Sequence, residues 1–339
     1  MNNAQKIPNV SEGSKPFVLS EILGGGKSVI YITYNEPHME QIAKVLPFFV
    51  DGVEILTFAG WDCLPYDKVS VNSAVMNSRI TTLAKLADSK PNRIILTTVS
   101  AVLQKIPQKK VIQSAYMELK KGSTVDRDDL INFLITNGYS RLGKVVEVGE
   151  FSVRGSIIDI FPPSCEAAYR LDFFGDTLEN IRTFDPMTQI SNKSVEKISL
   201  LPTSEIILTR DAIEKFRSKY RELFGTAKKD DALYNAISEG VKYHGMEHWL
   251  PLFYDKLDTL FDYLPDANIV LDTHTGTAIK ERLATIKEYY QARLEAGNIK
   301  HKILNEAETF NPLPPEMLYI MEDKLEKIFN GKTVIEFGN

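Results

Sequence analysis

The sequence predicts an α/β fold in which a discontinuous parallel-sheet domain is interrupted by a small, mainly antiparallel, β-rich α+β domain. Short apolar strands alternate with helical segments in the first part of the chain, which is typical of a parallel sheet covered by helices on both faces. Strand then follows strand from residue 143 to residue 185, which favours antiparallel pairing. A further apolar strand appears at residues 268–272, and it indicates that the first domain resumes there.

The first part of the α/β domain is expected over residues 1–116. Strands are expected where β-branched and apolar residues run together, at 29–34, 53–58 and 93–98. A helix should start near Pro37, and a second should cover residues 74–87, because apolar residues recur there at helical spacing. We expect each helix to pack on the sheet beside its strand.

The inserted β-rich domain is expected over residues 117–201, and the α/β domain should continue over 202–339. After a short helix at 128–139, the pattern predicts strands at 143–151, 153–161, 169–176 and 178–185. A helix with an apolar stripe should end at Gly225. Long insertions are tolerated when their two ends lie close together in the parent domain.

Composition excludes several classes of protein. Of 339 residues, 43% are apolar and 25% are charged, as in ordinary globular proteins. Two cysteines, Cys63 and Cys165, are too few for a disulfide framework and lack metal-ligand spacing. With no signal peptide or long apolar span, the chain is expected in the bacterial cytoplasm and not at a membrane. The pair His244 and His248 has a metal-compatible spacing, but Gly245 stands where a zincin has glutamate, so we expect no metal.

The stretch GGGKS at residues 24–28 resembles the end of a P-loop, the phosphate-binding segment of many ATPases. The P-loop pattern requires a glycine five residues before Gly26, and Glu21 stands there. A P-loop also follows a strand and opens a helix, whereas here the helical segment comes first and a strand follows. We therefore interpret the three glycines as a helix stop and turn.

The segment GEFSVRGSIIDIFPPSCEAAYRLDFFGDTLENIRTFDPMTQ at residues 149–189 resembles the second domain of UvrB. It is more closely similar to the matching domain of the bacterial transcription-repair coupling factor (Mfd) family. The upstream WDCLPYD and the downstream EHWLPLFY extend the resemblance over nearly the whole chain. The resemblance implies the N-terminal, UvrB-like module of that family. In this family, the RNA-polymerase-binding domain and the ATP-dependent DNA translocase lie in other parts of the full-length protein.

The resemblance also implies that the first domain is a degenerate, helicase-like relative of a nucleotide-binding domain. UvrB has a D-E-S-H motif whose glutamate positions the attacking water, but this chain has DTHT at residues 272–275. Thr273 cannot act as that carboxylate. A short polar run between Asp67 and Arg79 replaces the aromatic hairpin with which UvrB probes damaged DNA. We therefore expect no catalytic residues, no cofactor and no damage probing.

Apart from these lost functions, the resemblance implies a docking surface for the repair protein UvrA, formed by Arg154, Arg170 and Phe174. Alternate residues of a strand share a face, so Arg170 and Phe174 should lie on one face and Phe173 on the other, in the core. Arginine and aromatic side chains dominate the energetics of protein interfaces. The alternative is that these arginines are merely solvated and that Phe174 is core.

Charge separates the two functions that the sequence leaves open. The whole chain has a net charge of −5, and residues 117–201 contain ten basic and thirteen acidic residues. Surfaces that follow nucleic-acid phosphates are normally basic. The sequence therefore favours a non-catalytic module that recruits UvrA to stalled RNA polymerase, with polymerase and DNA contacted by the rest of a full-length protein. The alternative is a UvrB-like module that binds damaged DNA or hydrolyses ATP.

Overall fold

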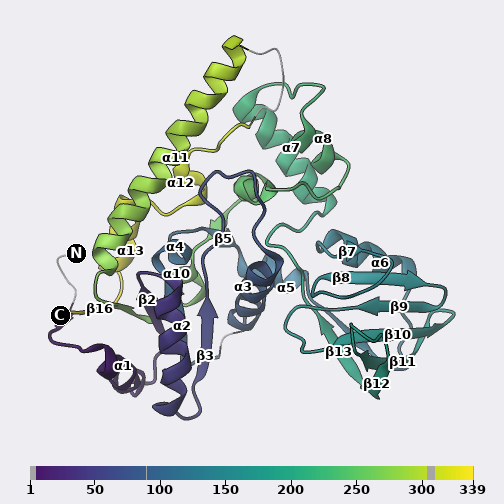
Figure 1. Cartoon of the computed structure of the whole chain (residues 1–339), viewed down its shortest axis with the longest axis horizontal. Coiled ribbons are helices and arrows are strands. Elements are labelled where there is room, and N and C mark those ends of the chain that lie inside the picture. Colours follow the sequence, from purple (N-terminus) through teal and green to yellow (C-terminus); the bar gives the residue numbers. More distant parts are fainter. Residues whose placement is uncertain (1–4, 89, 304–309, 339) are drawn as a thin grey trace. The chain divides into compact units, whose positions relative to one another are not determined.

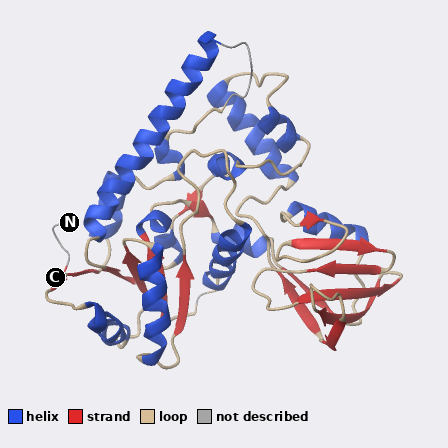
Figure 2. Cartoon of the chain, viewed as in Figure 1, coloured by secondary structure: helices blue, strands red, loops and turns tan. Residues whose placement is uncertain are grey.

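The structure, a computed structural model, describes residues 5–88, 90–303 and 310–338. The described chain forms two compact units (Figures 1 and 2). The first unit draws on three stretches, 1–70, 85–106 and 256–339, and the second on two, 71–84 and 107–255. No helix among the described residues is both long enough and apolar enough to cross a membrane.

The first unit is built on a parallel sheet, which confirms the predicted α/β class. Within the described residues its strand order is β1-β16-β15-β2-β4-β3, and each neighbouring pair is parallel. The strands are β1 (Gln5–Ile7), β2 (Val29–Thr33), β3 (Glu54–Phe58), β4 (Arg93–Thr98), β15 (Asn268–Leu271) and β16 (Val334–Phe337). Strand β15 pairs directly with β2, more than two hundred residues earlier, so the sheet is discontinuous in sequence as predicted.

Helices pack on this sheet because its strands are apolar on both faces. Every residue of β2 is buried, and Tyr31 belongs to a core cluster with Leu19 of α1 and Ile42 of α2. The helices of this unit are α1 (Lys15–Leu23), α2 (Glu36–Val45), α4 (Val99–Val102), α10 (Leu260–Tyr263), α11 (Thr275–Ile303), α12 (Pro315–Leu318) and α13 (Glu322–Asn330), with short 3-10 turns at Glu12–Ser14 and Leu46–Phe48.

The second unit contains a mostly antiparallel sheet. Within the described residues its order is β12-β11-β10-β9-β8-β7, and only the edge pair β7 and β8 is parallel. The strands are β7 (Ser140–Arg141), β8 (Glu150–Arg154), β9 (Ile157–Ile160), β10 (Ala168–Phe174), β11 (Thr177–Phe184) and β12 (Ser191–Ser194). One face of the sheet is covered by α6 (Arg127–Thr136), whose Leu130 and Leu134 share a core with Leu171.

The remaining elements of this unit flank the sheet in sequence. They are α3 (Ser73–Leu86), α5 (Lys109–Ser114), β6 (Met117–Lys120), β13 (Lys197–Leu200), α7 (Arg210–Phe224), α8 (Ala232–Ser238), a 3-10 turn at Met246–Trp249 and α9 (Leu250–Phe253). Inside the unit, the buried Arg79 of α3 donates from Nε to Glu205 Oε1 at 2.8 Å. The predicted insert, 117–201, holds the whole antiparallel sheet, and the unit extends beyond it on both sides.

Two predicted strands were wrong. Residues 143–149 form a loop, because the Glu150 carboxylate accepts hydrogen bonds from the backbone N–H groups of Val146 and Glu147 and curls the chain on itself. The segment 153–161 contains a hairpin turn instead of one continuous strand. Gly155 has a φ of +58°, a backbone conformation that glycine adopts readily, and it lies between β8 and β9.

Candidate functional site

The expected docking residues come from β8 and β10 of the antiparallel sheet. Leu171 and Phe173 point into the core and are 0% and 5% exposed, because alternate residues of β10 share a face. Phe174, at the end of the strand, is 76% exposed. The alternative that Phe174 is a core residue is therefore wrong. An exposed phenylalanine on an ordered strand forfeits its burial energy unless a partner covers it.

Asp159 of β9 joins the two expected arginines. Asp159 lies directly opposite Arg170 in the pairing of β9 with β10. Arg170 donates from Nε to Asp159 Oδ1 at 2.7 Å and from Nη2 to Asp159 Oδ2 at 3.0 Å. Arg154 donates from Nη2 to the same Oδ2. The Asp159 side chain is fully buried, whereas that of Arg154 is half exposed. Two guanidinium groups thus share one buried carboxylate, which the sequence analysis did not identify.

Arg170 is held from several sides. Its Nη1 donates to Ser191 Oγ at 3.1 Å and lies 3.4 Å from the Gln189 carbonyl oxygen. Its guanidinium carbon lies 5.0 Å from the centre of the Phe184 ring. The hydrogen bond with Asp159, the largest influence, raises the pKa of Arg170. Only 14% of its side chain is exposed, so Arg170 is far less accessible than Arg154.

GGGKS is a turn, as predicted. It joins the end of α1 to β2, and Gly24 caps the helix by donating its backbone N–H to the carbonyl oxygen of Ser20. Gly26 has a φ of +75°, the left-handed conformation common after a helix. Lys27 is exposed.

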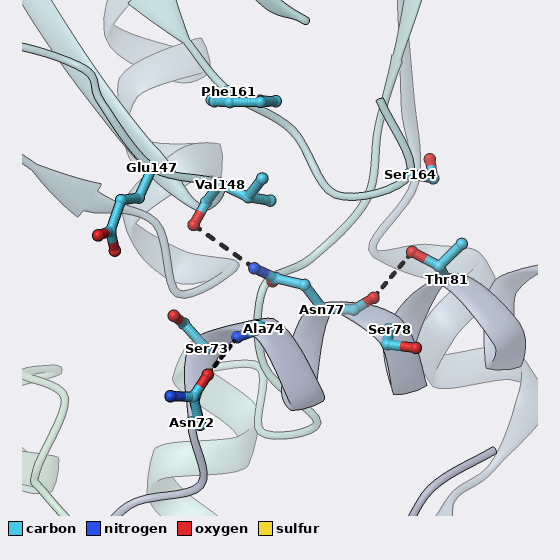
Figure 3. Close-up of a pocket in the computed structure, with 10 residues that line it drawn as sticks. All are labelled: Asn72, Ser73, Ala74, Asn77, Ser78, Thr81, Glu147, Val148, Phe161 and Ser164. Atoms are coloured by element: carbon cyan, nitrogen blue, oxygen red, sulfur yellow. Dashed lines mark hydrogen bonds between the residues drawn. The ribbon is translucent and has the colours of Figure 1, made fainter. Parts of the chain in front are cut away.

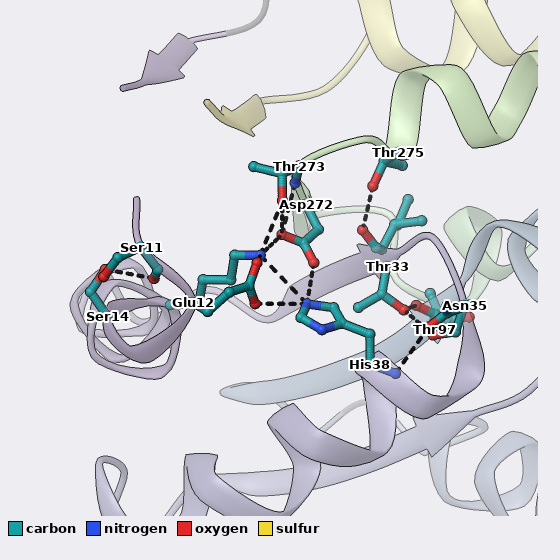
Figure 4. Close-up of polar contacts among 12 residues, drawn as sticks. Ser11, Glu12, Ser14, Thr33, Asn35, His38, Thr97, Asp272, Thr273 and Thr275 are labelled. Carbon is teal, nitrogen blue, oxygen red and sulfur yellow. Dashed lines mark hydrogen bonds and ion pairs between the residues drawn. The ribbon is translucent and has the colours of Figure 1, made fainter. Parts of the chain in front are cut away.

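A buried polar cluster lies where β15 of the first unit ends (Figure 4). Lys15 Nζ lies 2.7 Å from Asp272 Oδ1, and His38 Nε2 lies 2.6 Å from Asp272 Oδ2. Lys15 also donates to Thr273 Oγ1 at 3.1 Å and pairs with Glu12. The side chains of Lys15 and Asp272 are both fully buried. The buried ammonium group of Lys15 therefore has the buried Asp272 carboxylate as its counter-charge within the chain.

Tyr31 of β2 lies beside the same cluster. Burial, reinforced by the negative charge of Asp272, raises the pKa of its phenol far above the ordinary value. The phenol therefore stays protonated at neutral pH and adds no charge to the cluster.

The chain does contain the strand, loop and helix of a P-loop, but this arrangement leads to Lys15 and not to GGGKS. Strand β1 is followed by a loop and by α1, whose first residue is Lys15. Counted from a P-loop lysine at Lys15, the pattern demands glycines at 9 and 14 and a hydroxyl residue at 16. Asn9, Ser14 and Pro16 stand there. Asn9 has a φ of +58°, a conformation that asparagine tolerates in place of glycine.

The second unit also has a pocket of about 630 Å³ (Figure 3). Part of the wall is the first half of α3, and six of the ten lining residues have neutral polar side chains. Asn77 donates to the Val148 carbonyl oxygen at 3.4 Å across it. None of the three expected docking residues lines this pocket.

The two histidines at the metal-compatible spacing are not on one helix. Gly245, between them, has a φ of +78°, and the 3-10 turn begins only at Met246. Across the part of the chain that the structure describes, His, Cys, Asp and Glu side chains form no group of three or more that could hold a metal ion.

Comparison with known proteins identifies relatives over the whole chain. A model of the UvrB interaction domain matches residues 117–206. The transcription-repair-coupling factor of Rickettsia bellii is 34% identical over 317 residues, which are 93% of this chain and 28% of that relative. Those of Haemophilus influenzae and Escherichia coli are each 30% identical, over 99% and 91% of this chain and 28% and 27% of the relatives. The chain spans little more than a quarter of the length of these relatives. On these matches, the chain belongs to the transcription-repair-coupling factor family.

Proposed function

We propose that this chain is a non-catalytic docking module that binds UvrA and thereby brings it to stalled RNA polymerase in transcription-coupled nucleotide excision repair. The observation that carries the proposal is Phe174, an exposed aromatic side chain on the sheet that also carries Arg154. Aromatic and arginine anchors of this kind account for most of the binding energy of protein interfaces. The match to the UvrB interaction domain covers all three expected docking residues.

Charge supports a protein partner for this surface. Residues 117–201 are net negative, and Asp159 and Asp172 neutralise two of the three arginines on the exposed face, which are Arg154, Arg170 and Arg182. A surface that follows nucleic-acid phosphates needs an excess of cations. We assign contacts with RNA polymerase and DNA to parts of the longer relatives outside this match. The role places the chain in the bacterial cytoplasm.

The cluster at Lys15 supports the non-catalytic part of the proposal. A working P-loop lysine faces phosphate, and a neighbouring aspartate helps to hold magnesium. Here Lys15 and Asp272 pair with each other and are fully buried, so a nucleotide would have to break that pair. Pro16 offers no hydroxyl for magnesium, and Thr273 offers no carboxylate for water.

Titration calorimetry with purified UvrA tests the proposal. Replacing Phe174 with Ala should weaken binding about thirtyfold or more, the usual effect of losing an interface anchor. The matched control is Ile135→Ala, because Ile135 is an exposed apolar residue on α6, which covers the opposite face of the sheet. The control should bind like the wild type. Equal affinities for the wild type and Phe174→Ala would rule this surface out.

A further inference from the structure

We propose that the two arginines of the docking face have different roles: Arg154 contacts the partner, and Arg170 acts as a positioning residue through Asp159. The partner surface should then present a carboxylate for Arg154 beside an apolar hollow for Phe174. The inference rests on the proposed binding of UvrA and specifies the chemistry of its contact.

The hydrogen bonds of Arg170 leave it little to offer a partner. A guanidinium group has five N–H donors. All three nitrogens of Arg170 donate within the chain: Nε and Nη2 to Asp159, and Nη1 to Ser191 and Gln189, which uses four of the five N–H groups. With only 14% of the side chain exposed, at most one N–H can reach outward. Arg170 is thus part of the folded sheet.

Arg154 has the opposite properties. It donates from Nη2 to Asp159, and no other hydrogen bond or ion pair engages its guanidinium in the described part of the chain. Half of its side chain is exposed. Its remaining N–H groups form the planar fork that matches a carboxylate. Arg154 is therefore the guanidinium that is available for a partner.

Asp159 fixes the direction in which Arg154 points. Its carboxylate is fully buried, and its bidentate contact with Arg170 prevents it from turning. The single bond from Arg154 to this fixed oxygen restricts a long side chain that would otherwise sample many rotamers. Such pre-organisation reduces the entropy lost on binding.

Arg154 and Phe174 lie at the same end of the sheet. Arg154 is the last residue of β8, and Gly155 and Ser156 form the turn that follows it. The Ser156 carbonyl oxygen accepts a hydrogen bond from the backbone N–H of Phe173 at 3.0 Å. The turn after Arg154 therefore adjoins the residue before Phe174. Because the Arg154 guanidinium and the Phe174 ring lie at the same end of the sheet, we expect the partner to present a carboxylate next to an apolar hollow.

The test compares Arg154→Ala with Arg170→Lys by calorimetry against purified UvrA at several salt concentrations. Arg154→Ala should weaken binding about tenfold or more and flatten its salt dependence, because an ion pair with the partner is lost. Arg170→Lys should weaken binding by less than Arg154→Ala does and leave the salt dependence unchanged, because lysine keeps a positive charge beside Asp159 but loses the bidentate contact that holds the carboxylate in place. The matched control is Arg141→Ala. Arg141 is exposed, and on β7 it lies in register with Phe151, whose side chain belongs to the core and not to the docking face.

Asp159→Asn tests the positioning role separately. It should weaken binding in the wild-type background but add no further loss to Arg154→Ala, because a residue that acts through Arg154 has no effect without it. A purely structural role would lower affinity equally in both backgrounds and would overturn the assignment of Asp159. If Asp159→Asn does not fold, Arg170→Lys decides the matter.

The outcomes also separate this inference from the proposed function. If the wild type does not bind UvrA, the proposed function itself fails. If the wild type binds but Arg154→Ala is indistinguishable from it, or Arg170→Lys loses as much affinity as Arg154→Ala, only the division of roles is wrong.

Discussion

At the scale of single residues, the most consequential side chain is Lys15, which is buried beside Asp272. Removing one member of a buried ion pair leaves the other charge without compensation, at a cost of about 3 to 5 kcal/mol. We expect Lys15→Met to lower the free energy of unfolding by that amount in urea denaturation. The matched control is Lys27→Ala, in the exposed turn, which should change it by less than about 0.5 kcal/mol. Equal stabilities of the two variants would contradict the account of this cluster.

Cys165 gives a prediction about reactivity at the same scale. Burial raises the pKa of its thiol, so less thiolate is present at neutral pH than in a free cysteine, and the thiolate is the reactive form. In a Cys63→Ser background, alkylation of Cys165 should be slower than that of a model thiol at pH 7.5. Its rate should keep rising at pH values where the model thiol has levelled off. A rate equal to that of the free thiol would show that the group is not shielded.

At the scale of elements, two neighbouring residues of β10 should have different roles: one stabilises the fold and the other is expected to contact the partner. Phe173 is in the core and Phe174 is exposed. Phe173→Ala should cost roughly 3 to 5 kcal/mol of unfolding free energy through the cavity it leaves, whereas Phe174→Ala should cost less than about 0.5 kcal/mol. Thermal melting of both variants measures this directly. A sharp fall in the melting temperature of Phe174→Ala would mean that the faces of the strand are reversed.

Elements with a strong local period could be predicted from the sequence, and those set by turns could not. Alternation along β10 correctly predicted that Phe173 is in the core and that Phe174 is exposed, because the face on which a side chain lies depends only on its position within its own strand. The loop at 143–149 is apolar enough to resemble a strand, but its backbone bonds to side chains instead: Glu150 accepts two of its N–H groups, and Gln189 donates to the Val145 carbonyl oxygen. The turn at Gly155 was missed because residues on both sides of it favour strands.

The family resemblance, and not a local pattern, supplied Arg154, Arg170 and Phe174 as the expected docking residues. Asp159 was not among them, because its position opposite Arg170 depends on strand pairing across the sheet. Lys15 and Asp272 are even further apart in sequence and meet only in the folded sheet. The signal for Lys15 was a Gly-Ser-Lys at a helix start, and the better literal match at GGGKS concealed it.

At the scale of the whole molecule, net charge governs binding to nucleic acid. With a charge of −5, the chain should release few counterions from duplex DNA, and affinity depends largely on that release. We expect no saturable binding to a labelled duplex at physiological salt in fluorescence anisotropy, whether or not the duplex contains a lesion. Lesion-dependent binding at sub-micromolar protein would favour the alternative, a UvrB-like module that reads damage.

On the function proposed above, this chain by itself binds UvrA and does so without nucleotide chemistry. Light scattering coupled to size-exclusion chromatography, with micromolar wild-type chain and purified UvrA in nucleotide-free buffer, tests it most directly. We expect a complex whose mass is the sum of the two partners. We also expect this complex to be lost with a Phe174→Ala chain that melts at the same temperature as the wild type. Separate elution of the wild-type chain and UvrA, or a complex that forms equally well with Phe174→Ala, would contradict it.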